Sequence, residues 1–231
     1  MKRSFIQKIY RLNDIESLEK DLNYLGKEAK YDALTFCNIR LFTSILVFVL
    51  VLYISKIGYL LAPFVTILYY YGFYYYNITR RISLRNKRLE HQSLFFFEIL
   101  TLTLESGRNL ENALNVTCDN VSSDISSEFK EALDEMKYGK SLLEALSGIK
   151  SRISSDIINN IILNIMQTSE FGNSIIDTLH NEVDFLRDKQ ILEIKEKINK
   201  IPNKVSIISV LFVVPLILVL ILGPYIIQFI G

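Results

Sequence analysis

The octad GKSLLEAL, residues 139–146, has the sequence of a tight corner between two helices. Its glycine can adopt the left-handed conformation that ends a helix. Ser141 is a preferred helix N-cap, and Glu144, three positions later, completes the pattern of a capping box. Leu142 and Leu146 are spaced so that both side chains face one core. The octad therefore predicts a helix end, a sharp turn and a new helix packed on a core.

The octad pattern begins at two further glycines, Gly107 and Gly172. Each copy places an N-cap residue two positions after its glycine, and the copies at 139 and 172 place a carboxylate three positions after that. Apolar pairs recur at the same spacing, so each copy is expected to start a helix that faces a core. The expected corner residues are Gly107, Asn109, Gly139, Ser141, Glu144, Gly172, Ser174 and Asp177.

These corners divide the polar part of the chain, residues 80–204, into helices. No segment shows the period-two alternation that is typical of strands. A repeat of about 33 residues is also typical of TPR solenoids, but the chain contains no Trp and lacks the TPR pattern. We therefore expect an all-α fold with a bundle of six helices. The helices are predicted at 86–106, 109–121, 124–138, 141–150, 154–171 and 174–201.

Charge is segregated along the chain, because every Lys, Arg, Asp and Glu except Lys56 lies within 1–40 or 80–204. A membrane-spanning helix needs about 20 predominantly apolar residues. The uncharged stretches therefore predict an integral membrane protein. Its three transmembrane helices are expected at about 38–55, 59–76 and 205–231.

The same segregation gives the expected domain organisation. The parts are an N-terminal amphipathic segment at 1–37, a transmembrane hairpin at 38–79, a helical domain at 80–204 and a C-terminal transmembrane helix at 205–231. Within the first part, residues 14–31 place apolar side chains on one helical face and Glu and Lys opposite. We expect a solvated or membrane-surface helix there. The start of the chain lacks the continuous apolar run of a signal peptide.

Basic residues predict the orientation in the membrane. Clusters of Lys and Arg at 80–88 and 195–204 flank the helical domain, whereas only Lys56 lies at the tip of the hairpin. The positive-inside rule then places the N-terminus and 80–204 in the cytoplasm and the C-terminus outside. The Tyr and Phe residues at 69–76 are typical of an aromatic belt at the membrane surface, and a ligand-binding aromatic box is the alternative.

The overall composition argues against several classes of function. A net charge of +1 over 231 residues gives no global field for binding nucleic acid. The two cysteines, Cys37 and Cys118, form no disulfide framework, which fits a reducing interior. The two histidines, His91 and His180, cannot supply a three-histidine zinc site and are expected at the surface. We therefore predict no cofactor and no nucleic acid partner.

Five motifs occur in order along the chain: Leu104-Glu105-Ser106-Gly107, Tyr138-Gly139-Lys140-Ser141-Leu142, Glu170-Phe171-Gly172, Lys200-Ile201-Pro202-Asn203-Lys204 and Leu222-Gly223-Pro224. With these motifs, residues 88–231 resemble the type II secretion system F domain, in particular the TadB/TadC platform proteins of tight-adherence (Flp) pilus systems. The resemblance implies a non-catalytic platform in the bacterial inner membrane that couples a hexameric secretion ATPase to pilin assembly or protein export. It also implies pilin-like subunits and a paralogous platform subunit or second copy as partners.

Glu105 and Glu170 are the candidate residues for a partner interface. Each lies two positions before a corner glycine, at the helix end where the dipole disfavours an anion. A cation or arginine of a partner would relieve that position. Solvated carboxylates are the simpler interpretation, and a metal ion held between the two is a further alternative.

Other readings of the chain remain open at this stage. Gly139-Lys140-Ser141 matches the end of a phosphate-binding loop, but no glycine lies five positions earlier, so the N-cap explains it better. A membrane subunit of a transporter or signalling complex, docking on a different ATPase, is the main alternative function. A membrane-bound enzyme should show clustered His, Asp or Cys at a membrane edge, and we predict no catalytic or metal-binding residue.

Overall fold

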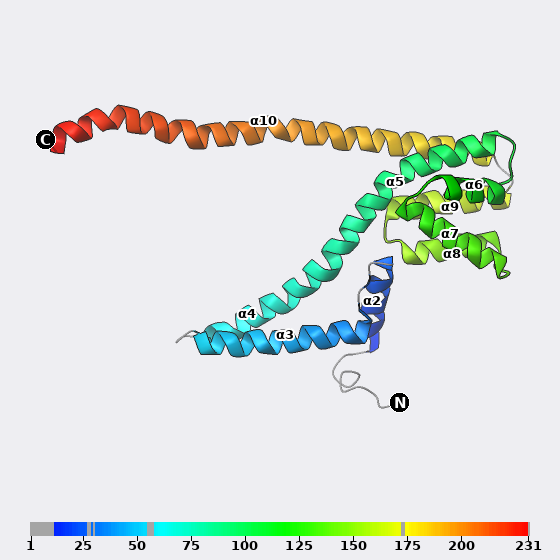
Figure 1. Cartoon of the computed structure of the whole chain (residues 1–231), viewed down its shortest axis with the longest axis horizontal. Helices are drawn as coiled ribbons and strands as arrows, with labels where there is room; N and C mark the ends of the chain where they lie inside the picture. The colour runs from blue at the N-terminus through cyan, green and yellow to red at the C-terminus, as the bar shows by residue number, and fades with distance from the viewer. Residues whose placement is uncertain (1–11, 27–28, 30, 55–57, 172–173, 231) are drawn as a thin grey trace. The chain divides into compact units, whose positions relative to one another are not determined.

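The computed structural model describes residues 12–26, 29, 31–54, 58–171 and 174–230. Within this part, side chains are described for 15–26, 29, 31–54, 58–169, 174–202 and 206–222. The described residues form helices and no strand, as Figure 1 shows, so the all-α prediction is confirmed. By its internal contacts the chain separates into two compact units, 1–183 and 184–231, and each is described by itself.

The first unit begins with a helical hairpin and a short helix at its base. Helix α3 (Ala33–Ile54) packs against α4 (Gly58–Tyr74), and the rings of Phe36 and Phe73 lie 5.6 Å apart. Helix α2 (Leu12–Asn23) is amphipathic, as predicted, but it ends at Asn23, whereas the helix was predicted at 14–31. Its apolar face does not lie free in solvent or on a membrane surface, because it is buried in a small cluster at the base of the hairpin. The cluster contains Leu18, Leu22, Leu25, Phe36, Cys37 and Ile78.

The expectation of three membrane spans needs correction. Among the described helices, two are long and apolar enough to cross a membrane, α3 and the part of α10 at 175–222. The span predicted at 59–76 falls short, since α4 has 17 residues and at a rise of about 1.5 Å each is shorter than the hydrocarbon layer. The α-helix then changes into a π-helix, η2 (Tyr75–Thr79), which leads into α5 without a loop.

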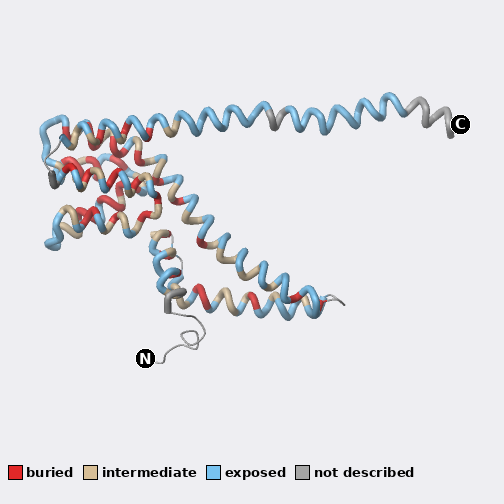
Figure 2. Tube along the Cα trace, turned by 180° about the vertical axis from the view of Figure 1, so that it is seen from behind, coloured by how far each residue is buried: buried red, intermediate tan, exposed pale blue. Residues whose placement is uncertain are grey.

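A packed helical domain follows the hairpin. It consists of α5 (Arg80–Glu105), α6 (Leu110–Asn120), α7 (Asp124–Lys137), α8 (Leu142–Arg152) and α9 (Asp156–Phe171), together with the first turns of α10 (Ile175–Ile230). The aromatic centre of its core is Phe96, Phe97 and Phe129, with the rings of Phe96 and Phe129 stacked 4.7 Å apart. Figure 2 shows that buried residues are concentrated in these helices. The six predicted helices are therefore present in order, while their closure into one bundle stays a prediction.

Helix boundaries differ from the prediction at both ends of this domain. The first helix was expected to begin near 86, but α5 begins at Arg80 as a direct continuation of the hairpin. The last helix and the C-terminal span were expected as separate elements, but α10 is a single helix of 56 residues. Pro202 lies inside it, and the α-helix continues on both sides of that residue.

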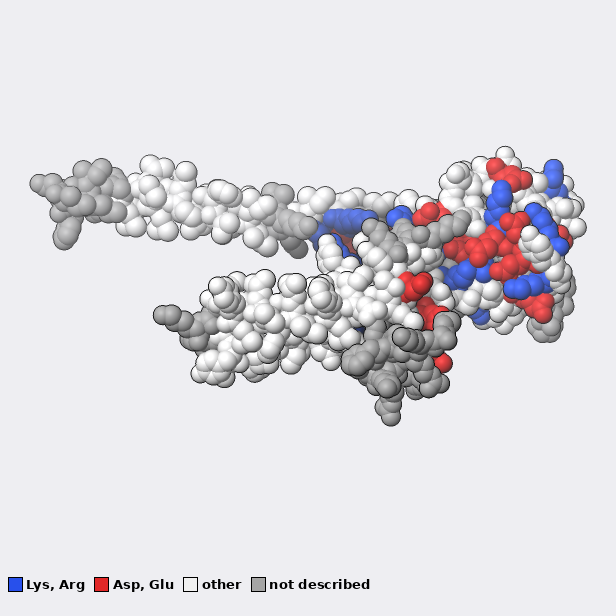
Figure 3. Space-filling view, turned by 60° about the horizontal axis from the view of Figure 1, so that its bottom comes forward, with Lys and Arg blue, Asp and Glu red and all other residues white. Residues whose placement is uncertain are grey.

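Most of α10 belongs to the second unit, 184–231. Every described side chain of this unit from Ile191 to Leu222 is exposed, including Phe212 at 71%. An isolated helix with so many exposed aliphatic and aromatic side chains is unfavourable in water, so a lipid or protein environment is required. The part of α10 at 206–222 contains no Lys, Arg, Asp or Glu, and Figure 3 shows such residues on the helical domain and on the earlier turns of α10.

Candidate partner interface

Two of the predicted corners have the expected backbone. Gly107 has φ +86° and Gly139 has φ +99°, values in the left-handed region that favours glycine. Their N–H groups donate to the carbonyl oxygens of Leu104 and Met136, each at 2.9 Å, which closes the preceding helix. The space around both glycines is open, so the conformation itself selects glycine there. Gly172, the third corner glycine, lies outside the described residues.

The residues after these glycines cap the following helices. The Asn109 side chain accepts from the Asn112 N–H at 2.9 Å. At the second corner, Ser141 accepts from the Glu144 N–H at 3.3 Å, and the Glu144 carboxylate accepts from the Ser141 N–H at 2.8 Å. The Ser141 hydroxyl also donates to the Glu144 carboxylate, at 2.9 Å. The bond from the Ser141 N–H, and after it the bond from the hydroxyl, lower the pKa of Glu144 below its ordinary value.

The third corner keeps its cap. The Asp177 N–H donates to the Ser174 side chain at 3.3 Å at the start of α10. Thr168 of α9 and Thr178 of α10 lie within hydrogen-bond distance, with their hydroxyl oxygens 3.1 Å apart. Asn164 of α9 donates to Glu182 of α10 at 2.6 Å. The start of α10 is thus fixed beside α9 by polar contacts at two positions, Thr178 and Glu182.

Of the two carboxylates chosen as interface candidates, Glu105 already has a partner within the chain. Its Oε1 lies 2.7 Å from Nε2 of His180, which projects from the second turn of α10. The carboxylate at the helix end is therefore satisfied internally, although both side chains remain about half exposed. Glu170 lies near the end of α9, and its side chain is outside the described residues.

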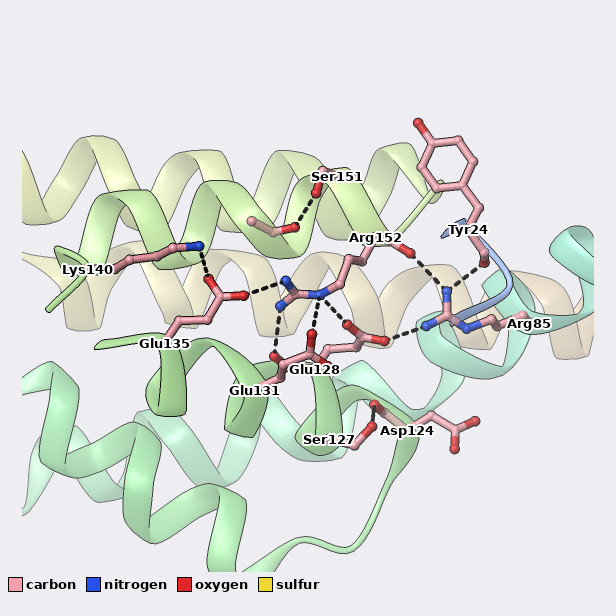
Figure 4. A network of polar contacts seen from close by, with 11 residues as sticks. Tyr24, Arg85, Asp124, Ser127, Glu128, Glu131, Glu135, Lys140, Ser151 and Arg152 are labelled. Atoms are coloured by element: carbon pink, nitrogen blue, oxygen red, sulfur yellow. Dashed lines mark hydrogen bonds and ion pairs between the residues drawn. The ribbon is translucent and has the colours of Figure 1, made fainter. Parts of the chain in front are cut away.

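The strongest polar feature of the domain was missed by the sequence analysis. Arg85 of α5 and Glu128 of α7 form an ion pair of 2.6 Å with side chains only 6% and 8% exposed. Arg152, at the end of α8, donates through Nε to the second oxygen of Glu128 at 2.9 Å and through Nη1 to Glu135 at 2.9 Å. Lys140 extends this network by donating a hydrogen bond to Glu135 at 2.9 Å. Figure 4 shows this network, which joins three helices of the domain.

The charges in the network stabilise one another. Burial alone would lower the pKa of Arg152, but its hydrogen bond to Glu128 and the nearby carboxylates outweigh burial and raise that pKa. The hydrogen bond from Lys140 and the charge of Arg152 lower the pKa of Glu135. A signal for the network was present in the sequence, because Glu128 lies on the same face of α7 as the buried Ile125 and Ala132. A charge on a core-facing position needs a buried partner.

Several residues that were considered for other chemistry have structural roles or surroundings of their own. They contain no group of three or more His, Cys, Asp and Glu that could hold a metal ion. Lys140, the lysine of the phosphate-loop-like triplet, is engaged with Glu135, and Ser141 acts as a cap. Burial raises the pKa of Cys118 to about 12, so this thiol is protonated and unreactive at neutral pH.

The comparison with protein families decides what this domain is. Residues 96–223 match the family described as type II secretion system (T2SS), protein F. The chain belongs to the T2SS protein F family. No curated protein and no solved structure matches it.

The T2SS protein F match begins within α5 and ends within the apolar part of α10. It includes all three corners, the Glu105–His180 pair and most of the charged network, but Arg85 and helices α2 to α4 lie before it. Proteins of this family are inner-membrane components, which agrees with the two apolar helices.

Proposed function

We propose that this protein is a non-catalytic platform of a T2SS-like or type IV pilus-like machine, and specifically of the TadB/TadC type. The observation that carries the proposal is the T2SS protein F match across a charged helical domain that continues directly into an exposed apolar helix. The domain supplies a surface for a cytoplasmic partner, and the apolar helices supply an anchor. A partner that hydrolyses ATP would act on the domain, and the anchor would transmit that action to membrane-embedded subunits.

The proposed topology places the N-terminus and the helical domain in the cytoplasm and the C-terminus outside. Arg80, Arg81 and the lysines at 195–204 lie where the apolar helices meet the polar domain, and the positive-inside rule favours the cytoplasm for such clusters. Although α4 alone is shorter than the hydrocarbon layer, the proposed orientation requires entry and exit on the cytoplasmic side by the α3–α4 hairpin. Its outer surface is rich in exposed apolar side chains such as Phe42, Phe64 and Leu68, which lipid would cover.

The proposed partners are a hexameric secretion ATPase, pilin-like subunits, and a paralogous platform subunit or second copy. The ATPase contact should be polar, because a cycling motor must release its platform, and polar rims favour fast and reversible binding. Glu105 and Glu170 remain our candidate residues for this contact. For Glu105 the proposal now requires an exchange, in which a partner cation replaces or shares the His180 contact.

Binding of the ATPase can be measured directly. The full chain in lipid nanodiscs would be tested against the secretion ATPase encoded by the same organism, at low and high salt. We expect binding that weakens with salt, no ATP hydrolysis by the chain alone, and at least tenfold weaker binding for Glu105→Lys, by the range of about 2–5 kcal/mol for truncated interfacial charge pairs.

His180→Gln is the matched control for Glu105→Lys. It removes the imidazole that contacts Glu105 but leaves the Glu105 carboxylate available to a partner. Wild-type affinity in His180→Gln with weakened binding in Glu105→Lys would assign the carboxylate to the interface. Equal effects of the two changes would show that Glu105 acts within the chain, and absence of binding by the wild type would remove the ATPase from the proposal.

A further inference from the structure

Arg85 joins the helical domain to a segment that precedes the hairpin. Its Nη1 donates to the carbonyl oxygen of Tyr24, just after α2, at 2.7 Å and to that of Arg152, at the end of α8, at 3.0 Å. Its Nη2 donates to Glu128 at 2.6 Å. One buried guanidinium therefore holds three chain segments that are far apart in sequence, as Figure 4 shows.

Gly26 makes the close approach of Arg85 possible. It has φ +53°, and a β-carbon at this position would lie 2.7 Å from Nη2 and 3.1 Å from Cζ of Arg85. That distance is too short for any residue other than glycine without displacement of the guanidinium. The backbone after α2 and the arginine of α5 are thus fitted to each other.

The contact between α2 and the helical domain is otherwise open. The apolar face of α2 packs into the cluster at the hairpin base, with Phe36 and Ile78, and not into the core of the domain. Between α2 and helices α7 and α8 lies a groove of about 970 Å³, whose lining includes charged residues such as Glu16, Lys20 and Glu131 as well as apolar ones such as Ile15 and Leu34. Two separate apolar cores are therefore bridged by a polar contact, and a contact of that kind can open without exposing a core.

We propose that Arg85 forms a releasable contact, called the latch below, between the helical domain and the segment that follows α2. Through α2 this contact also holds the candidate span α3. A shift of the domain that withdraws Arg85 from the Tyr24 carbonyl would release α2 while the pairs of Glu128 and Arg152 persist. Movement of the domain would then reach the hairpin by two routes, along α5 and through the latch. The movement that would open the latch depends on the proposed function, but the contacts that form the latch do not.

Hydrogen–deuterium exchange of the full chain in nanodiscs tests the latch. Arg85→Lys keeps a positive charge beside Glu128 but cannot reach both carbonyl oxygens and the carboxylate together. Gly26→Ala keeps the arginine at position 85 but introduces a β-carbon that would lie 2.7 Å from Nη2, so the guanidinium and the backbone after α2 must move apart. In both variants we expect the amides of α2 to exchange at least about tenfold faster, and those of α7 and α8 to change much less, because the hydrogen bond that holds the segment after α2 is lost while the domain core remains packed.

Gly139→Ala is the matched control, since it also replaces a glycine of positive φ, but nothing lies within 4 Å of the new β-carbon. It should leave exchange in α2 at the wild-type rate. Unchanged α2 exchange in Arg85→Lys would overturn the latch. Equal loss of protection in α2, α7 and α8 would also overturn it, because Arg85 would then belong to the domain core. Since no ATPase is present, either result is independent of the proposed partner.

Discussion

Nη2 of Arg85 lies 2.6 Å from Oε1 of Glu128, and neither side chain is more than 8% exposed. A buried ion pair contributes little net stability relative to an apolar pair, but loss of one member leaves the other charge unpaired. The pair therefore makes the packing of α5 on α7 highly sensitive to substitution.

Glu128→Ala should destabilise the helical domain by about 3–5 kcal/mol, because it leaves Arg85 and Arg152 facing each other without a carboxylate between them. Chemical denaturation of the full chain in detergent, followed by the signal of the helical domain, would measure this. Glu131→Ala is the control, since Glu131 lies 3.6 Å from Arg152 and is about half exposed. Its loss should cost less than about 1 kcal/mol. Equal effects of the two changes would contradict the special role of Glu128.

The second corner offers a test of the backbone and of the cap. Gly139→Val should destabilise the domain by more than about 1 kcal/mol, because a β-branched residue is strained at φ +99°. Ser141→Ala should cost about 1 kcal/mol through loss of the capping box. Ser147→Ala, an exposed change within the same helix, should be neutral or slightly stabilising. Thermal melts unaffected by the first two changes would show that this corner does not support the fold.

Acid should weaken the domain through Glu135 and Glu144. Both carboxyl groups have pKa values lowered from 4.5 in the folded chain, by a hydrogen bond from Lys140 for Glu135 and from the Ser141 backbone for Glu144. A lowered folded pKa gives stability that is fully present above the unfolded value and is lost as the pH falls through the folded value.

The melting temperature should therefore fall as the pH is lowered below about 4.5, and the fall should be smaller in the double variant Glu135→Gln, Glu144→Gln. The Gln side chains keep part of the hydrogen bonding but have no charge to titrate. Identical pH dependence in the double variant and the wild type would assign the acid sensitivity to other groups.

Reporter fusions would test the proposed orientation. A fusion after Ser154, in the connection between α8 and α9, should report the cytoplasm, and a fusion at the C-terminus should report the outside. A fusion after Asn77, in the π-helix that leads into α5, should also report the cytoplasm if the hairpin enters as one unit. A cytoplasmic signal at the C-terminus would contradict the proposed topology.

Local patterns in the sequence predicted the helices well. Corners such as Gly139–Glu144 depend on a positive φ and on hydrogen bonds within a few residues, so their structure is set locally. Family membership could be inferred for the same reason, since the ordered corners are the most distinctive part of the chain.

Contacts between distant segments could not be predicted in this way. Arg85 was one of several basic residues in a cluster that indicated only orientation, and its partners Tyr24, Glu128 and Arg152 are at least 43 positions away. Likewise, the position of Glu105 at a helix end was evident, but its hydrogen-bond partner His180 is 75 residues later. The extent of α10 was also missed, because Pro202 suggested a break that the helix does not make.

The central claim is that this member of the T2SS protein F family is the membrane platform through which a secretion ATPase drives assembly or export. The most direct measurement is the fraction of pilin-like subunit or exported substrate that leaves the membrane in cells with and without this chain. We predict that deletion stops release as completely as a catalytically inactive secretion ATPase does, while synthesis and membrane insertion of the subunit continue, and that the wild-type chain restores release. Normal release in the deletion strain, with the ATPase still required, would contradict the platform function.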